Sequence, residues 1–378
     1  MTPFSGLLFF YAMGILLLPA IVLGLMGKPL RHYGLMFTFV MLIFIFSENG
    51  QLVSLTVFYL WETVLCYMYL RVGKKSRITL ILVVTLSLLP LAAVKLGEIF
   101  ATLRMFRLLG VSYMTFRGVQ VLLDIHDGKL KELRLPDLSY FLLFFPSVAS
   151  GPIDRYQRFA TDLERKLSRD EYMEMLRRGV WKLLFGAFSA IVASGTIHSL
   201  WLSPLPDHGF LATLSYMYGY TFYLFFNFAG YSSMAVGTAY ILGISLPENF
   251  RMPFLSVDMK DFWSRWHISL STWLRDYLYT RFVRGSLKAK RFKNPRTASY
   301  LGYILNMTVM GIWHGLTPPY ILYGVYHSLL MCLNEALDLH WKPFRKMKQK
   351  GWTHVAAVIV TFHLFSFGLL IFSGRLFS

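Results

Sequence analysis

Two histidines are the residues of this chain whose type and surroundings best suit chemistry. His314 follows a tryptophan in the apolar stretch Asn306–Gly315, which reads NMTVMGIWHG. Gly311 and Gly315 flank the histidine with small residues, which let another backbone or a substrate approach closely. Imidazole is the side chain best suited to accept a proton near neutral pH. The stretch makes His314 a candidate general base near a helix end, and a purely structural histidine stays open as the other interpretation.

His267 lies in the aromatic stretch Phe262–Tyr277, which reads FWSRWHISLSTWLRDY. If this stretch is helical, five residues form one apolar face: Trp263, Trp266, Leu270, Trp273 and Tyr277. His267, Ser271 and Arg275 are spaced by four and fall on a neighbouring polar stripe. Two interpretations are open at this point. The stretch is either an interfacial amphipathic helix or a helix whose polar stripe lines the entrance to a site.

The remaining ionisable residues in apolar runs are weaker candidates for a functional role. His198, His327 and His363 are functional candidates because ionisable residues are costly inside a membrane. A neutral histidine that hydrogen-bonds to a neighbouring helix is the favoured interpretation of each of them. Glu62 is interpreted as a buried carboxyl paired with a polar neighbour, without a role. The two cysteines, Cys66 and Cys332, lie in apolar runs, and their spacing indicates neither a disulfide framework nor a metal site.

The elements that position these residues are those of a membrane protein. Of the 378 residues, 55% are hydrophobic and 15% are charged, against about 25% charged in an ordinary soluble domain. This composition excludes a disordered chain, an ordinary nucleic-acid-binding domain and a soluble enzyme. The net charge is +18, but the basic residues lie in short clusters between apolar runs. That pattern is typical of the cytosolic loops of a membrane protein, so a nucleic acid partner is not expected.

The apolar runs predict an all-α polytopic membrane protein. About eleven spans are expected, because a span needs about 20 apolar residues. The candidates are residues 4–26, 33–46, 52–70, 78–94, 108–123, 138–149, 180–202, 210–244 (two spans broken near 227–230), 300–316, 320–337 and 355–372. Short candidates suggest re-entrant or buried helices. With no internal repeat, residues 1–378 are expected to form one integrated domain.

Two polar stretches interrupt the apolar runs. Residues 154–178 carry apolar residues at helical spacing and predict an amphipathic helix on the inner membrane face. Residues 247–296 mix aromatic, charged and apolar residues, which fits a cytosolic or interfacial segment better than a span. If the basic clusters face the cytosol, the N-terminus is extracellular.

The stretches Phe262–Tyr277 and Gly311–Gly315 together resemble the membrane-bound O-acyltransferase family. Phe145–Ile153, Phe226–Ser232 and Pro247–Phe250 support the resemblance, which covers roughly residues 110–324. Within the family, the chain is more similar to the branch that D-alanylates teichoic acid in the cell envelope of Gram-positive bacteria. The alginate-type O-acetyltransferases share Arg275–Tyr279 but continue with an Ile-Pro-Leu-Gly-Gly-like turn, where this chain reads TRFVR.

The resemblance implies helices around a central tunnel in the plasma membrane and an acyl transfer across it. The donor would be D-alanine, held as a thioester on the phosphopantetheine arm of an acidic cytosolic carrier protein. No tightly bound cofactor and no metal are implied. The acceptor would be a teichoic acid hydroxyl, reached directly or through a small membrane peptide or a partner protein.

The resemblance also assigns residues. His314 would be the catalytic base and His267 the second catalytic-site histidine. By their proximity to the two histidines in the sequence, and not by the resemblance, Trp263, Trp266, Ser271, Arg275 and Asn306 are expected to line the tunnel or its entrance. The carrier would dock on a basic surface with an apolar centre, made of Arg281, Phe282, Val283, Arg284 and Lys288. Three alternatives stay open: an alginate-type O-acetyltransferase, a transporter or flippase without bond-making chemistry, and a subunit that only recruits the carrier.

Overall fold

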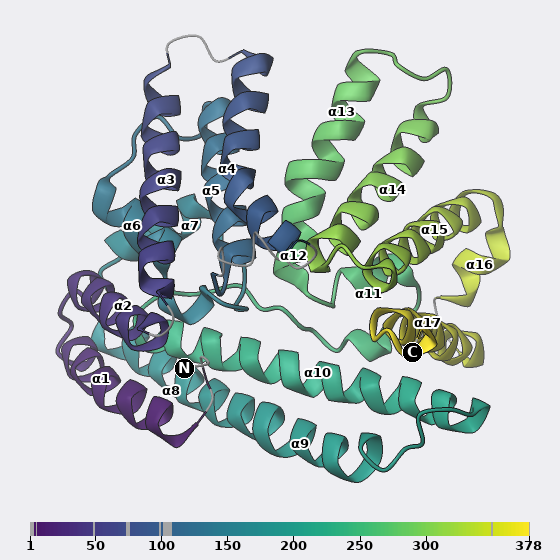
Figure 1. The fold of residues 1–378 in the computed structure, drawn as a ribbon, viewed down its shortest axis with the longest axis horizontal. Coiled ribbons are helices and arrows are strands. Elements are labelled where there is room, and N and C mark those ends of the chain that lie inside the picture. Colours follow the sequence, from purple (N-terminus) through teal and green to yellow (C-terminus); the bar gives the residue numbers. More distant parts are fainter. Residues whose placement is uncertain are drawn as a thin grey trace. The chain divides into compact units, whose positions relative to one another are not determined.

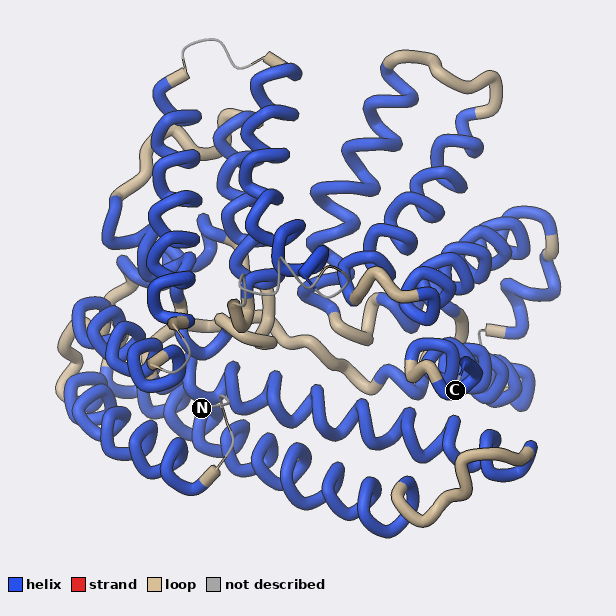
Figure 2. The backbone as a smooth tube through the Cα atoms, in the orientation of Figure 1, coloured by secondary structure: helices blue, strands red, loops and turns tan. Residues whose placement is uncertain are grey.

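The computed structural model describes residues 4, 6–47, 50–72, 76–97, 100, 108–348 and 351–377. These residues form helices joined by turns and loops, and no strand occurs among them (Figure 2). The described chain divides into two compact units. The first comprises Met1–Ala187 with Tyr231–Pro247, and the second comprises Phe188–Gly230 with Glu248–Ser378. The prediction of an all-helical membrane fold is thus confirmed.

The first unit contains the N-terminal helices, drawn from purple to teal in Figure 1. They are α1 (Leu7–Leu25), α2 (Arg31–Phe46), α3 (Gln51–Arg71), α4 (Arg77–Gly97), α5 (Val111–His126), α6 (Leu135–Leu143), α7 (Tyr156–Glu164) and α8 (Arg169–Ala187). Helix α5 packs against both α3 and α4, and α1 packs against α2 and α8. Almost every residue of α5 is buried, so it is the core helix of this unit.

A buried arginine holds the irregular segment that follows α6. Arg117 of α5 is only 1% exposed. Its guanidinium donates to the carbonyl oxygens of Phe141 and Leu142, each at 3.0 Å, and to that of Ser147 at 2.6 Å. The carbonyls at a helix end lack partners within the helix. Arg117 supplies those partners where water cannot reach.

The second unit contains the C-terminal helices. They are α9 (Ser194–Ile197), α11 (Met259–Trp263), α12 (Ile268–Leu274), α13 (Thr280–Lys288), α14 (Pro295–His314), α15 (Pro318–His340), α16 (Lys342–Met347) and α17 (Trp352–Phe372), with a π-helical segment at Arg275–Tyr279. Helix α10 (Phe210–Ile241) begins in this unit and ends in the first. Helices α13 and α14 form a hairpin (Figure 1).

Helices α14 and α15 meet at two glycines. A Cβ atom added at Gly311 would lie 2.4 Å from the backbone oxygen of Tyr320, and one added at Gly324 would lie 2.6 Å from that of Met307. Only residues without a side chain allow this approach, as at the small-residue interfaces of membrane helices. The contact lies within one turn of His314, so it fixes the end of α14 on which that histidine stands.

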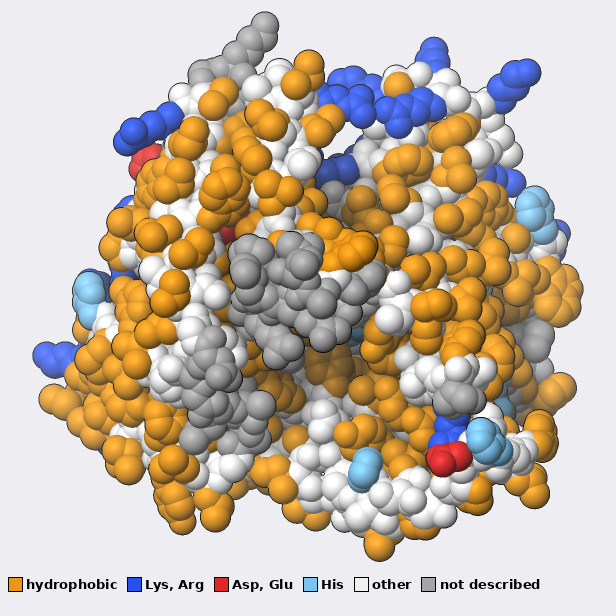
Figure 3. All heavy atoms as spheres, in the orientation of Figure 1, with side chains coloured by type: hydrophobic (Ala, Val, Ile, Leu, Met, Phe, Trp, Pro, Cys, Tyr) orange, Lys and Arg blue, Asp and Glu red, His pale blue; other side chains and the backbone are white. Residues whose placement is uncertain are grey.

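Five described helical stretches are long and apolar enough to cross a membrane: Leu7–Leu25, Gln51–Arg71, Arg77–Gly97, Arg169–Leu202 and Trp352–Phe372. Arg31–Phe46 is a shorter apolar helix. Hydrophobic side chains cover much of the face shown in Figure 3, as lipid-facing helices require. The described helices thus support fewer spans by length and composition than the predicted eleven.

Three sequence predictions about the helices are wrong. Residues 138–149 do not form a span, because α6 ends at Leu143 and a 3₁₀ turn with Pro146 follows. Residues 210–244 are not two broken spans, because α10 runs without a break to Ile241. Residues 154–178 hold parts of two helices, α7 and α8, rather than one amphipathic helix.

Candidate active site

A cavity of about 460 Å³ lies within the second unit. Its lining comes from α11, α12, the π-helical segment, α14 and α15. The lining residues are Arg251, Lys260, Trp263, Ser264, Ser271, Thr272, Leu274, Arg275, Tyr279, Tyr303, Asn306, Met307, Met310 and Met331. Four of the five predicted tunnel residues are among them: Trp263, Ser271, Arg275 and Asn306. The structure therefore brings these four to one cavity, although they stand on different elements.

His314 stands one helical turn beyond this cavity. Asn306, Met307 and Met310 line it from α14. Met307, Met310 and His314 are spaced by three and four residues, which places them on one face of the helix. The four residues from Met310 to His314 correspond to a rise of about 6 Å along the helix axis. The cavity thus runs along α14 toward the predicted base.

The imidazole of His314 is half-buried among aromatic rings. Its ring centroid lies 4.6 Å from that of Trp313 and 5.0 Å from that of Phe372, which stands perpendicular to it. Tyr323 lies 6.2 Å away. These rings restrict how the imidazole can turn and keep bulk water from most of its surface. A base in such a setting acts in a low dielectric, where electrostatic interactions are stronger than in water.

His267 occupies a sharp turn between α11 and α12. Its backbone has φ 46° and ψ 49°, in the left-handed region that non-glycine residues rarely adopt. Asn249 holds this turn from a distant part of the sequence. Its backbone oxygen accepts from the Ile268 N–H at 2.9 Å, and its side-chain oxygen accepts from the Ser269 hydroxyl at 2.6 Å. Strain of this kind persists only where the surroundings enforce it, and it is concentrated at functional sites.

The side chain of His267 is buried and close to His314. It is 3% exposed, and its ring lies 4.6 Å from Phe228 and 6.2 Å from Trp313. Burial lowers the pKa of His267 well below its usual value, and the nearby His314 lowers it further. The imidazole is therefore neutral at pH 7. Its Nε2 atom is buried and has no hydrogen-bond partner among the residues that the structure describes.

The condition that Phe262–Tyr277 is one continuous helix is not met, because the turn at His267 separates α11 from α12. The five aromatic and apolar residues are buried, but not as one helix face. Trp266 does not line the cavity. It packs instead into an aromatic cluster, with ring centroids 4.7 Å from Phe365 and 5.0 Å from Phe250. His267 also lies outside the lining, unlike Ser271 and Arg275.

The predicted docking residues all belong to α13. Arg284 and Lys288 are exposed, and neither forms an ion pair with another described residue. Phe282 and Val283, the predicted apolar centre, are half-buried. A Cβ atom at Gly302 of α14 would lie 3.0 Å from Val283, so this side chain faces the hairpin partner.

Several lining residues were not predicted. Met307, Met310 and Met331 supply flexible apolar surface, and Tyr279 and Tyr303 stack at 4.8 Å. Helical spacing from Asn306 was the available signal for Met310, which follows it by four residues. Leu287 is an exposed apolar residue between Arg284 and Lys288 on α13, and composition alone did not single it out.

Among the other ionisable candidates, Glu62, His327 and His363 are buried or hydrogen-bonded. The hydrogen bond to a neighbouring helix expected for His327 is not formed, because neither of its ring nitrogens has a partner among the described residues. Glu62 accepts a hydrogen bond from the Ser87 hydroxyl at 2.9 Å, as its interpretation as a paired buried carboxyl requires. His363 bonds to the Ile359 carbonyl at 2.7 Å within its own helix. His327 is buried among the rings of Trp263, Tyr323 and Tyr326. Among the described residues, no group of three or more His, Cys, Asp or Glu side chains could hold a metal ion.

Similarity to known proteins bears on which reaction this site performs. The sequence profile of the membrane-bound O-acyltransferase family matches residues 80–374, which include every residue of the cavity. The chain belongs to this family. It is therefore a membrane-bound acyltransferase and a multi-pass membrane protein. The alternatives of a transporter and of a subunit that only recruits a carrier are set aside by this assignment.

Similar proteins cover the chain to different extents. A teichoic acid D-alanyltransferase of Bacillus subtilis is 41% identical, over 100% of this chain and 99% of its own length. One of Streptococcus thermophilus is 36% identical, over 99% of this chain and 95% of its own length. A probable alginate O-acetylase of Pseudomonas syringae is 31% identical, over 62% of this chain and 44% of its own length. Full-length similarity thus extends to the D-alanyltransferases, while the alginate relative shares only part of its length.

Proposed function

We propose that this acyltransferase moves D-alanine from a thioester donor to a hydroxyl of teichoic acid. The full-length similarity to teichoic acid D-alanyltransferases supports this choice of acyl group and acceptor. The observation that carries the proposal is the cavity, which runs along α14 to within one turn of His314. A cavity of about 460 Å³ is within the usual range for a small-molecule site.

The donor is proposed to be the phosphopantetheine arm of a carrier protein, charged with D-alanine. Such an arm carries amide groups, a phosphate and an apolar stem. Asn306 and Trp263 line the cavity, and each has a buried polar atom (Oδ1 and Nε1) without a partner among the described residues. An amide of the arm would supply partners for both atoms. The side chains of Arg251, Lys260 and Arg275 line the same cavity and suit the phosphate.

The chemistry proposed for His314 is general-base catalysis. The acceptor hydroxyl attacks the thioester carbonyl, and His314 takes the hydroxyl proton as the new C–O bond forms. The C–S bond then breaks, and the departing thiolate receives that proton. Thiolate is a good leaving group, so no covalent acyl-enzyme is needed. The neutral His267, held in its strained turn near His314, is proposed to position the reacting group through its unpaired Nε2.

The carrier is proposed to dock on α13. Arg284, Leu287 and Lys288 follow helical spacing and are all exposed, so they form one outward face. Two cations beside an exposed leucine suit an acidic partner with an apolar contact point, because charges steer the encounter and a desolvated centre holds it. Arg281 extends this face by one turn, and Leu287 takes the place of the predicted apolar centre, because Val283 faces α14. This face is proposed to lie on the cytosolic side, with the N-terminus outside.

The test follows labelled D-alanine from a charged carrier in membrane vesicles that hold the protein and lipoteichoic acid. Vesicles from cells without the protein are the control, and an acetyl-charged carrier tests the alginate-type alternative. The proposal expects protein-dependent label on lipoteichoic acid and little acetyl transfer. Preferential transfer of acetyl, or release of free D-alanine without labelled lipoteichoic acid, would contradict it. The direct acceptor is identified by the membrane component that is labelled first.

A further inference from the structure

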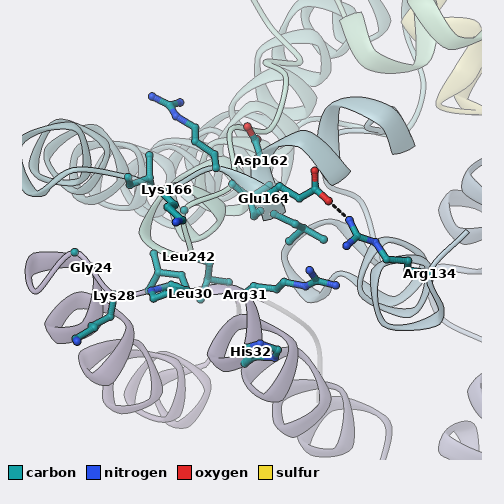
Figure 4. Close-up of a pocket in the computed structure, with 17 residues that line it drawn as sticks. Gly24, Lys28, Leu30, Arg31, His32, Arg134, Asp162, Glu164, Lys166 and Leu242 are labelled. Carbon is teal, nitrogen blue, oxygen red and sulfur yellow. Dashed lines mark hydrogen bonds and ion pairs between the residues drawn. The ribbon is translucent and has the colours of Figure 1, made fainter.

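A second cavity, of about 610 Å³, lies in the first unit, and no residue of the proposed reaction is among those that line it. It is formed by the α1–α2 turn, the start of α6, the α7–α8 connection and the segment after α10 (Figure 4). Five cationic residues line it, against two carboxylates, Asp162 and Glu164. The cationic residues are Lys28, Arg31, Arg134, Arg165 and Lys166. Arg31 and Arg134 pair with Asp137, and Arg165 pairs with Glu171, so Lys28 and Lys166 are the two cations that supply an excess of positive charge for an anionic ligand.

The carboxylates of this cavity are already occupied. Asp162 accepts from Arg158 at 2.9 Å and from the Ser245 backbone N–H at 2.8 Å. Glu164 pairs with Arg134, as the dashed line in Figure 4 shows. Neither Lys28 nor Lys166 forms an ion pair with any residue that the structure describes. The two lysines, on different segments of one cavity, thus keep their charge available for a ligand.

The backbone adds a second anion-binding feature. Helix α2 begins at this cavity with Leu30 as its N-cap, and no side chain caps its first turn. Leu30, Arg31 and His32 all line the cavity. The first N–H groups of a helix lack partners within the helix, and the helix dipole favours a negative charge beside them. Phosphate groups bind at helix N-termini for these reasons.

The position of the cavity favours a lipid as the source of the anion. Helix α1 has 19 residues, about 28 Å of helix, which matches a hydrocarbon core of about 30 Å. Its exposed apolar residues Leu18, Val22 and Met26 follow one stripe that ends beside Lys28. The cavity therefore lies where a lipid-facing span ends, at the depth of the head groups. Leu30, Leu163 and Leu242 give it an apolar wall as well.

We propose that this cavity binds the phosphate head group of an anionic phospholipid, with Lys28, Lys166 and the first turn of α2 as its ligands. The acyl chains would lie along the exposed stripe of α1. The cations, the uncapped helix start and the apolar wall lie together in the first unit, so the site forms without the cavity of the second unit. The inference is therefore independent of the acyl group, the donor and the acceptor of the reaction.

The test measures lipid binding to the purified full-length protein by native mass spectrometry and by thermal stabilisation. Phosphatidylglycerol is compared with phosphatidylcholine of the same acyl chains, and inorganic phosphate is added as a competitor. The wild type should prefer phosphatidylglycerol. The double variant Lys28→Gln/Lys166→Gln should weaken that binding about 30-fold. Each lysine near an anionic lipid surface contributes about 1 kcal/mol, and the sum of about 2 kcal/mol corresponds to about 30-fold in affinity.

Two control variants show whether an effect depends on the position of the lysines and on their charge. Lys131→Gln/Lys342→Gln removes two exposed lysines outside the cavity and should leave the lipid preference unchanged. Lys28→Arg/Lys166→Arg keeps the charge and should keep the preference. A phosphatidylglycerol preference that survives in the glutamine variant overturns the site. Equal stabilisation by inorganic phosphate overturns the lipid assignment, and the absence of any preference in the wild type overturns both.

Discussion

Gly311→Ala perturbs the contact between α14 and α15 that holds His314. The added Cβ would stand 2.4 Å from the Tyr320 backbone oxygen and 3.0 Å from the Gly324 Cα. Both neighbours belong to the backbone, so no flexible side chain can move aside. The Tyr320 carbonyl must retreat by about 1 Å to restore an ordinary contact of 3.4 Å. The start of α15 and the end of α14 therefore separate where the imidazole stands.

The expected effect is larger on catalysis than on stability. Overpacking of this kind typically costs about 1–3 kcal/mol of unfolding free energy. A misplacement of about 1 Å at a catalytic group can cost about 100-fold in rate. We expect a moderate fall in melting temperature and a fall of about 100-fold in acyl transfer, while carrier binding persists because α13 is untouched.

The assay compares initial transfer rates, carrier binding and melting temperature on the same preparations. Gly195→Ala is the matched control, since no atom lies within 4 Å of the added Cβ. Alanine in a helix is favoured over glycine by about 1 kcal/mol, so this control should keep its activity and stability. Gly311→Ala with the wild-type transfer rate and melting temperature would refute the argument that this contact positions His314.

Three further predictions concern docking, pH and packing. Arg284→Glu/Lys288→Glu should slow carrier association at least about tenfold at low salt and less at high salt, and unchanged association rates by surface plasmon resonance would argue against α13. Because the pKa of His267 is lowered in the folded state by burial and then by His314, only the unfolded chain gains this proton as pH falls below about 6.5. Stability should therefore be full above that pH and fall below it, by up to about 1.4 kcal/mol per unit for this group, and His267→Gln should flatten the pH series of melting temperatures. Arg117→Lys should cost about 2–4 kcal/mol by leaving buried carbonyls unpaired, and a melting temperature like that of the exposed control Arg177→Lys would contradict this.

The sequence predicted the helical class and part of the site because both follow from local patterns. Apolar runs indicate membrane helices without any information about the elements that pack against them. Helical spacing from Asn306 places cavity residues and His314 on one face of α14. Trp263, Ser271 and Arg275 were expected at the site because they lie near His267 in the sequence. Helical periodicity does not explain why they line the cavity, since the helix assumed for them is interrupted.

The errors come from interactions that local patterns do not contain. The turn at His267 depends on Asn249, almost twenty residues earlier, whose hydrogen bonds enforce a backbone that histidine avoids. A break was expected in α10 near Gly230. A glycine costs a helix only about 1 kcal/mol, which is too little to interrupt a helix of 32 residues. The opposite error occurred at residues 138–149. The apolar composition was taken to indicate a span, although Pro146 lacks an N–H and its ring disfavours a helix interior.

The most direct test of the account is transfer from a D-alanyl-charged carrier by His314→Ala, with carrier binding measured on the same membranes. His208→Ala is the matched control, since this histidine is exposed in a loop of the same unit. The account predicts that transfer falls about 100-fold or more for His314→Ala, as for loss of a general base, while carrier binding and the control stay at wild-type levels. Transfer by His314→Ala at the wild-type rate would remove His314 from the chemistry and contradict the proposed mechanism.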